Sequence, residues 1–208
     1  MSAPVCYIVA AGEGFVPFAP CEGDLVIAAD GGCRHLAAVG VRPDLVVGDL
    51  DSCESLPDGV PVQRHPVRKD ETDTALALRI GYDRGYRDFV VLGGLGGRED
   101  HSFANFSLLL YMKQRGANVI LRSETTDVCV ILSEEFCIEG RVGDVVSLFA
   151  LGGAAHGVTL HGLSYPLTNA TLTPDVPLGV SNELTHTVAH VTVREGALLC
   201  FHVHAPSV

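Results

Sequence analysis

Short apolar runs alternate with polar, glycine-containing segments over the first 120 or so residues of the chain. Runs rich in β-branched residues predict buried strands, and the amphipathic stretches between them predict helices. The expected strands are 5–10, 25–29, 45–47, 61–65, 88–92 and 118–122, and the expected helices are 33–39, 72–84 and about 100–113. Phe103, Phe106 and Leu110 share one face of the last helix. Strands alternating with helices predict an α/β unit with a parallel, doubly wound sheet of the Rossmann-like kind.

The pattern changes after about residue 125. Helical periodicity disappears, and short β-rich runs recur between segments of Gly, Pro, Asn and Thr. The expected strands are 127–132, 144–149, 156–160, 188–193 and 197–203, with a polar loop at 179–183 and a hairpin turn at Arg194-Glu195-Gly196. We therefore expect two domains, an α/β domain over residues 1–125 and a small all-β domain over residues 126–208.

Acidic residues follow two of the predicted strands. Asp49 and Asp51 stand at alternate positions after the strand 45–47, and Asp30-Gly31-Gly32 follows the strand 25–29. Ligands of open α/β sheets bind outside the carboxyl ends of the strands, and Mg²⁺ prefers oxygen ligands such as carboxylates. The sequence thus predicts a magnesium site here, with a solvated turn capped by Asp and Ser side chains as the alternative.

Two further segments carry groups that suit phosphate. The first has four glycines in five residues, Gly93 to Gly97, and then Arg98 before a predicted helix. Backbone N–H groups at a helix start and the fork of an arginine both bind anions, although the loop is not a Walker A motif and a flexible turn is the alternative. The second is Lys69-Asp70-Glu71-Thr72-Asp73, where Asp70 or Thr72 can cap the following helix. Its acids fit a phosphate and metal site, or else only complement the helix dipole.

Composition narrows the function classes. The net charge of -11 over 208 residues argues against a nucleic-acid binder, but it allows a nucleotide substrate because Mg²⁺ can stand between carboxylates and phosphates. Seven cysteines without a CxxC pair indicate reduced thiols and a cytoplasmic protein. The N-terminus lacks the features of a signal peptide, and no run of about 18 apolar residues predicts a membrane span.

Four histidines lie in the predicted β domain: His186, His190, His202 and His204. His202 and His204 fall on one strand face, so a metal pair is conceivable. Because spacing places no third ligand beside them, we interpret these side chains as exposed or hydrogen-bonded.

Taken together, these segments resemble the thiamine pyrophosphokinase family, in order and spacing along nearly the whole chain. The matching stretches are Ala29 to Gly32, Pro43 to Ser52, Lys69 to Asp73, Gly93 to His101 with Asn105, and Ser181-Asn182. The resemblance implies transfer of a pyrophosphoryl group from ATP to the hydroxyl of thiamine, giving thiamine diphosphate and AMP. It also implies that the β domain is a sandwich and that the protein is a homodimer with shared active sites.

The resemblance assigns roles to individual residues. The metal-binding aspartates fall on Asp49, Asp51 and Asp73. The nucleotide-binding positions fall on Asp30, Gly31, Gly32, Lys69, Asp70, Thr72, Gly94, Gly96, Gly97 and Arg98, and the thiamine contacts on Ser181 and Asn182. Lys69 and Arg98 would neutralise phosphate charge, and the catalytic base is Asp100 or a member of the aspartate cluster.

Two positions depart from the family's pattern. Ala75 stands where many members carry an acid, and the chain has no tryptophan to stack on thiamine. Tyr165, Phe201 or a histidine can take that place. Two other functions stay open: a pyrophosphokinase that acts on a hydroxymethyl pterin, and a non-catalytic sensor of thiamine or nucleotide. The number of metal- and phosphate-binding groups argues against the sensor.

Overall fold

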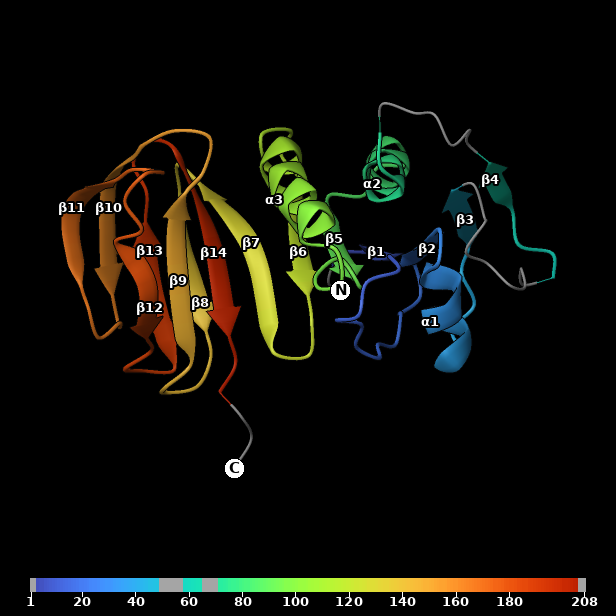
Figure 1. The fold of residues 1–208 in the computed structure, drawn as a ribbon, viewed down its shortest axis with the longest axis horizontal. Coiled ribbons are helices and arrows are strands. Elements are labelled where there is room, and N and C mark those ends of the chain that lie inside the picture. Colours follow the sequence, from blue (N-terminus) through green and yellow to red (C-terminus); the bar gives the residue numbers. More distant parts are fainter. Residues whose placement is uncertain (1–2, 49–57, 65–70, 206–208) are drawn as a thin grey trace. The chain divides into compact units, whose positions relative to one another are not determined.

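The computed structural model describes residues 3–48, 58–64 and 71–205. They form two compact units, one ending at Glu124 and one beginning at Thr125. Within the described ranges, no helix has the length and apolar character needed to span a bilayer. The described residues of the first unit form helices and strands, whereas those of the second form only strands and their connections (Figure 1).

The first unit is built on parallel strands. Their order is β6-β5-β1-β2-β3-β4, and every neighbouring pair is parallel. The strands are β1 Val5–Val9, β2 Leu25–Ala29, β3 Leu45–Gly48, β4 Val62–Arg64, β5 Asp88–Leu92 and β6 Asn118–Arg122. The helices are α1 Gly32–Ala38, α2 Asp73–Asp83 and α3 Glu99–Lys113. Each predicted strand and helix of this region is confirmed to within about two residues, the accuracy expected of element ends.

Helices cover both faces of this sheet. Leu36 of α1 packs with Val26 and Val46 in one buried cluster. On the other face, Gly81 brings α2 close to the sheet, because a Cβ added there would lie 2.7 Å from Phe89 and 2.8 Å from the sulfur of Cys6. Since successive strand residues point to opposite faces, α1 and α2 enclose the strands between them (Figure 1).

Helix α3 buries a different face from the one that contains Phe103, Phe106 and Leu110. Phe103 is 70% exposed, whereas Asn105, Leu109 and Met112 are buried. The polar Asn105 is inside because its amide Nδ2 donates to the carbonyl oxygen of Gly94 at 2.8 Å, and a buried amide needs such a partner.

The second unit consists of two antiparallel sheets, with orders β12-β9-β14-β7 and β11-β10-β13-β8. Side chains of both sheets share one buried cluster that includes Ile131, Leu148, Leu160, Val191 and Leu198, which makes the unit a β-sandwich. The strands are β7 Thr126–Leu132, β8 Glu135–Glu139, β9 Val145–Ala150, β10 Ala155–His161, β11 Leu167–Leu172, β12 Gly179–Glu183, β13 Val188–Thr192 and β14 Ala197–Val203.

Two expectations for this unit are wrong. Residues 179–183 are not a loop but the edge strand β12, which pairs with β9 through a register shift between Gly179 and Asn182. A polar edge strand lacks the alternating apolar pattern that predicts strands. Arg194 to Gly196 does turn the chain, but it is not a hairpin, because β13 and β14 belong to different sheets.

Candidate active site

The strand order of the first unit creates a switch point between β1 and β5. From β1 the chain adds β2, β3 and β4 on one side, and then β5 and β6 on the other. In open α/β sheets, ligands bind outside the carboxyl ends of the strands at such a point. Backbone hydrogen bonds connect the segments that leave β1 and β5 there. The N–H of Ala10 donates to the carbonyl oxygen of Leu92 at 2.8 Å, and the N–H of Gly12 donates to that of Gly93 at 2.8 Å.

The glycine-rich loop that follows β5 uses backbone conformations that favour glycine. Gly93, Gly96 and Gly97 have φ values of 66°, 80° and 73°, which other residues adopt only with strain. A Cβ on Gly93 would lie 2.4 Å from the carbonyl oxygen of Ala10. Asn105 from α3 binds the carbonyl oxygen of Gly94, so the first part of the loop is held on two sides.

A cavity of about 330 Å³ opens at this switch point. It is bordered by the glycine loop, the residues after β1, and the first turns of α2 and α3. The lining residues are Ala10, Ala11, Gly12, Glu13, Thr74, Gly93, Gly94, Gly96, Gly97, Arg98, His101 and Asn105. The predicted residues Gly94, Gly96, Gly97 and Arg98 therefore face one space, beside the helix start that carries Asp73.

Arg98 is engaged by the carboxylate of Asp100. Its Nε donates to Asp100 Oδ1 at 3.1 Å and its Nη2 donates to Oδ2 at 2.6 Å. The hydrogen bond from Arg98 is the main cause that lowers the pKa of Asp100. Both side chains are mostly exposed, at 71% and 65%. The fork that would bind a phosphate is thus filled by an internal carboxylate at the rim of the cavity.

The start of α2 is capped by Thr72, one of the two predicted capping residues. Its Oγ1 accepts from Ala75 N–H at 3.2 Å, and the half-buried Asp73 stands in the first turn. Glu71 makes a two-point ion pair with Arg79, with its shorter contact at 3.1 Å, so it stabilises the helix. Lys69 and Asp70 lie outside the described residues.

Asp30 occupies a left-handed turn after β2, with φ 46°. Its N–H donates to Val47 at 2.8 Å, and a Cβ on Gly48 would lie 3.2 Å from Asp30. Asp30 is therefore placed beside the residue that precedes Asp49. Gly31 caps α1, and Gly32 leaves no room for a side chain because a Cβ would meet the carbonyl oxygen of Val9. Asp49 and Asp51 themselves lie outside the described residues.

In the β unit, Ser181 and Asn182 are placed differently. Ser181 is exposed with φ 55°. Asn182 is buried, and its amide is used internally: Oδ1 accepts from Tyr165 N–H at 2.9 Å and Nδ2 donates to Tyr165 O at 2.8 Å. Asn182 and Tyr165 also line a cavity of about 310 Å³ with Leu160, Leu167, Leu178, Gly179 and Val180. Asn182 thus positions Tyr165, a residue that is 69% exposed.

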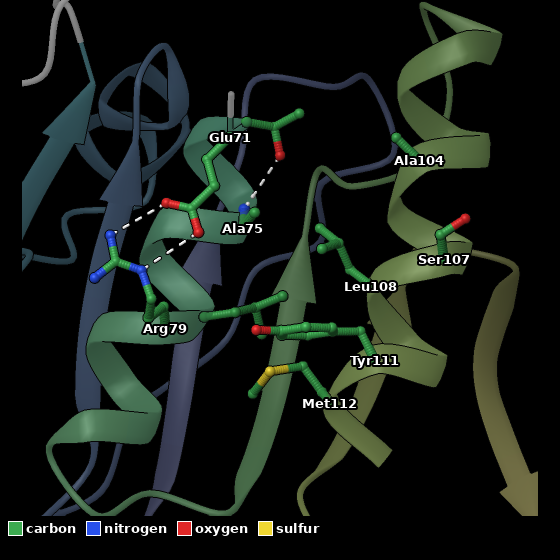
Figure 2. A pocket seen from close by; sticks show the side chains of 10 residues that line it. Glu71, Ala75, Arg79, Ala104, Ser107, Leu108, Tyr111 and Met112 are labelled. Carbon is green, nitrogen blue, oxygen red and sulfur yellow. Dashed lines mark hydrogen bonds and ion pairs between the residues drawn. The ribbon is translucent and has the colours of Figure 1, made fainter. Parts of the chain in front are cut away.

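A further cavity, of about 450 Å³, lies between α2 and α3 (Figure 2). Its lining is largely apolar and includes Leu78, Leu108 and Met112. Arg79, the one basic side chain among the described residues that line this cavity, is paired with Glu71. Of the predicted site residues that the structure describes, only Thr72 lines the cavity.

Sequence reasoning missed several residues that line the switch-point cavity, among them Gly12, Glu13 and Thr74. The segment after β1, Ala11-Gly12-Glu13-Gly14, lacks the third glycine of the dinucleotide fingerprint, so no sequence motif marks it. The signal that would have found it is topological, because β1 is the strand at which the order reverses.

Comparison with known proteins agrees with this geometry. The family model for the catalytic domain of thiamin pyrophosphokinase matches residues 21–121, and the model for its vitamin B1 binding domain matches residues 134–198. The thiamine pyrophosphokinase of Bacillus subtilis (strain 168) is 28% identical over 185 residues, which is 86% of each chain.

Solved structures give the same result. A thiamine pyrophosphokinase from Bacillus subtilis superimposes with a TM-score of 0.89 at 26% identity, covering 97% of this chain and all of that chain. A thiamin pyrophosphokinase from Geobacillus thermodenitrificans gives 0.85 at 27% identity, over 98% and 99% of the two chains. The yeast enzyme, at 14% identity and a TM-score of 0.75, shares the fold.

This chain joins a parallel α/β unit that carries a glycine-rich loop to an antiparallel β unit. Together with the matches above, this architecture identifies a kinase-type enzyme that transfers pyrophosphate. The two family models lie on the two units and together cover most of the chain. The chain belongs to the thiamine pyrophosphokinase family, so the resemblance found in the sequence is confirmed.

Proposed function

We propose that this protein transfers a pyrophosphoryl group from ATP to the hydroxyl of thiamine, giving thiamine diphosphate and AMP. The observation that carries the proposal is the cavity at the β1/β5 switch point, where the glycine loop, Arg98 and the start of α2 converge. We further propose that the parallel, doubly wound first unit serves as a Rossmann-like nucleotide-binding domain over residues 1–125, and that residues 126–208 bind thiamine in the cytoplasm.

The phosphates of ATP would lie against the glycine loop. Backbone N–H groups there and at the start of α3 are oriented before the ligand arrives, so they stabilise anionic oxygens without reorganisation. Arg98 would exchange Asp100 for a phosphate, since both offer two oxygens to its fork. Asp30, Gly31 and Gly32 would approach the nucleotide from β2, with Lys69, Asp70 and Thr72 at the start of α2.

The donor set fits magnesium. The described candidate, Asp73, offers carboxylate oxygen from the first turn of α2, and Asp30 is held beside Gly48, which leads to Asp49 and Asp51. These aspartates all offer carboxylate oxygen, the kind of ligand that a hard cation such as Mg²⁺ prefers over sulfur or imidazole nitrogen. We assign Asp49, Asp51 and Asp73 as its ligands. When bound, Mg²⁺ supplies positive charge that offsets the charge of the phosphate oxygens.

The attacking hydroxyl must lose a proton. In the free protein, the hydrogen bonds from Arg98 and from the N–H of His101 both lower the pKa of Asp100. The bond from His101, at 3.0 Å, remains when Arg98 moves to a phosphate, so Asp100 stays a weak base. We therefore assign the role of catalytic base, the group that accepts this proton, to a carboxylate of the cluster Asp49, Asp51 and Asp73.

The acceptor would be held by the β unit. Ser181 is exposed to a ligand, Asn182 fixes Tyr165, and the phenol ring of Tyr165 offers a flat face on which a thiamine ring can stack. Because the phosphate cavity and the acceptor cavity belong to different units, one site must draw on both. We propose a homodimer with shared active sites, and two-fold symmetry is the commonest form of assembly.

One assay tests the function. Purified protein is incubated with ATP and Mg²⁺ together with either thiamine or a hydroxymethyl pterin, and AMP is measured. We expect AMP and thiamine diphosphate in equal amounts with thiamine and none with the pterin. AMP formed with the pterin, or ADP in place of AMP, would refute the assignment.

A further inference from the structure

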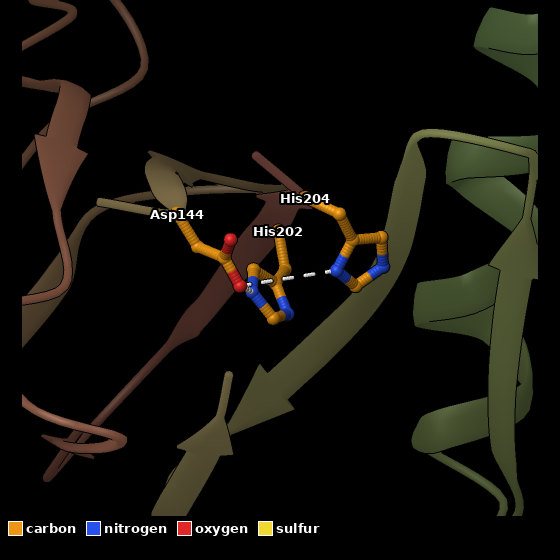
Figure 3. A group of neighbouring side chains, drawn as sticks. All are labelled: Asp144, His202 and His204. Atoms are coloured by element: carbon orange, nitrogen blue, oxygen red, sulfur yellow. Dashed lines mark hydrogen bonds and ion pairs between the residues drawn. The ribbon is translucent and has the colours of Figure 1, made fainter. Parts of the chain in front are cut away.

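Three potential metal ligands converge in the β unit, at the end of β14 (Figure 3). They are Asp144, which precedes β9, His202 on β14, and His204 just beyond it. One ligand atom of each residue lies within 4.8 Å of the other two. This is the only such group among the described residues. The sequence places His202 and His204 two positions apart, on one strand face, but it does not indicate Asp144, which is 58 residues away from His202.

The distances suit a metal ion. Asp144 Oδ2 lies 2.9 Å from His202 Nε2 and 4.0 Å from His204 Nδ1. Tetrahedral ligands at zinc bond lengths of about 2.0–2.2 Å stand roughly 3.3–3.5 Å apart. The two measured distances lie on either side of this value, so an ion would draw His204 in and move His202 away by about half an ångström each.

The surroundings fix the carboxylate of Asp144 and place a second carboxylate near His204. The backbone N–H groups of Arg141 and Ala205 fix the carboxylate of Asp144 at 2.9 and 2.8 Å. The second nitrogen of His204, Nε2, lies 3.8 Å from Asp127 Oδ2. A carboxylate behind a ligating histidine is the usual partner in metal sites, where it sets the tautomer and raises the basicity of the ring.

Burial leaves one side of the group open. The side chains of Asp144 and His202 are 2% and 11% exposed, and that of His204 is 41% exposed. A Cβ on Gly140 would lie 2.6 Å from Asp144 Oδ2 and 2.8 Å from His202 Nε2, so this backbone closes the inner side. An ion could enter past His204 and keep water as a fourth ligand.

We propose that Asp144, His202 and His204 bind a divalent transition-metal ion of the zinc type. Two imidazoles and one carboxylate are ligands of this class and differ from the oxygen donors assigned to magnesium. Asp144 ends the segment that leads from β8 in one sheet to β9 in the other. The ion would tie this crossover to β14, and its role is to stabilise the β unit rather than to take part in phosphate transfer.

Zinc chloride and cobalt chloride are the probes. The full chain is stripped with a chelator, and bound metal is measured by equilibrium dialysis at neutral pH. We expect one tightly bound zinc per chain, a Co²⁺ form with the absorption of a tetrahedral site, and a rise in Tm with zinc concentration. The exposed His204 can be changed without unfolding, and His204→Ala should weaken zinc binding by at least about 100-fold and abolish the rise. Asp127→Asn should weaken binding by about 10–100-fold.

Two control variants test whether zinc binds at other positions of the chain instead. His190 Nδ1 lies 3.4 Å from the thiol of Cys137 on the surface of the same unit, so His190→Ala removes the most obvious competing pair. Asp73→Asn removes a candidate magnesium ligand. Neither change should alter the amount of zinc bound per chain or the affinity for it. Absence of stoichiometric zinc binding, or unchanged binding in both His204→Ala and a folded His202→Gln protein, overturns the proposal.

Discussion

Arg98 and Asp100 face each other across the start of α3 in a two-point ion pair, with contacts of 3.1 and 2.6 Å. Arg98 also lines the switch-point cavity. The carboxylate therefore occupies the groups that we assign to a phosphate of ATP. Binding of ATP must break this pair, which makes Asp100 a competitor for the nucleotide site.

The first prediction concerns Asp100→Asn. The neutral amide holds the guanidinium less strongly, so the KM for ATP should fall by a few-fold, the scale of an exposed ion pair, with kcat little changed. Steady-state kinetics at varied ATP measures both. A fall in kcat by ~10²-fold or more would instead identify Asp100 as the catalytic base. Arg98→Lys is the companion variant, and it should raise the KM because lysine lacks the fork.

The second prediction separates two glycines of the loop. At Gly97 no atom lies within 4 Å of an added Cβ, so Gly97→Ala meets only the strain of φ 73°, about 1–2 kcal/mol. At Gly93 an added Cβ lies 2.4 Å from Ala10 O, so Gly93→Ala should lower the free energy of unfolding by about 3 kcal/mol or more. Urea titration measures the difference.

The matched control for Gly97 is Gly116. It has φ 78° with no neighbour within 4 Å, in the turn after α3. Gly116→Ala should cost as much stability as Gly97→Ala and leave the KM for ATP unchanged, whereas Gly97→Ala should raise it. Equal kinetics for the two variants would remove the loop from the ATP site.

The third prediction compares Asn182 with Ser181. Asn182→Ala removes the side-chain partner of the partly buried backbone N–H and carbonyl groups of Tyr165. It should lower the free energy of unfolding by about 1 kcal/mol and raise the KM for thiamine, because Tyr165 loses its anchor. Ser181→Ala should change stability by no more than about 0.5 kcal/mol and still raise this KM. Thermal unfolding and kinetics test both, and an unchanged KM in Asn182→Ala would exclude the positioning role.

Much of the first unit follows from the sequence, because central strands such as β2 and β3 are continuous runs in which every residue is buried. The β unit was harder. Strand β12 is a polar edge strand, and its place is set by pairing with β9, which periodicity does not report. Asn105 shows the same limit on α3, since its burial depends on a carbonyl oxygen 11 residues away.

The candidate site divides in the same way. The phosphate loop was visible because glycines and an arginine are contiguous in the chain. The segment from Ala10 to Glu13 joins it through the switch point, a property of strand order. Asp144 reaches His202 only through the folding of distant strands, so no spacing rule could place it.

The fourth prediction concerns acid stability of the chelator-stripped protein. Burial alone would raise the pKa of Asp144, but hydrogen bonds from Arg141 N–H, Ala205 N–H and His202 lower it to about 2, from 3.8 in the unfolded chain. A lowered folded pKa stabilises the native state above pH 3.8, and this contribution is lost as the pH falls towards 2.

Urea midpoints between pH 6 and pH 2 measure this loss. The destabilisation caused by Asp144→Asn should be largest above about pH 4 and shrink towards pH 2. Glu135→Gln, a change of an exposed carboxylate on β8, is the control and should have little effect at any pH. A constant effect of Asp144→Asn across the range would contradict the assigned pKa.

The last prediction concerns the proposed assembly. Asp51→Asn removes a magnesium ligand and should reduce turnover by ~10²-fold or more. A Tyr165→Ala, Ser181→Ala double variant should lose thiamine binding while keeping its phosphate groups. Each protein alone is then nearly inactive, for a different reason.

Mixing the two proteins distinguishes a shared site from a site within one chain. If each site takes its phosphate groups from one subunit and its thiamine contacts from the other, a heterodimer contains one intact site and one site with both defects. Activity should then return towards half of the wild-type value per dimer. If each site is built within one chain, both sites of the heterodimer keep a defect and activity stays low. Native mass spectrometry of the mixture provides the control, because it shows whether subunits have exchanged. Exchange without recovered activity would rule out shared sites and leave the assignment of the phosphate cavity intact.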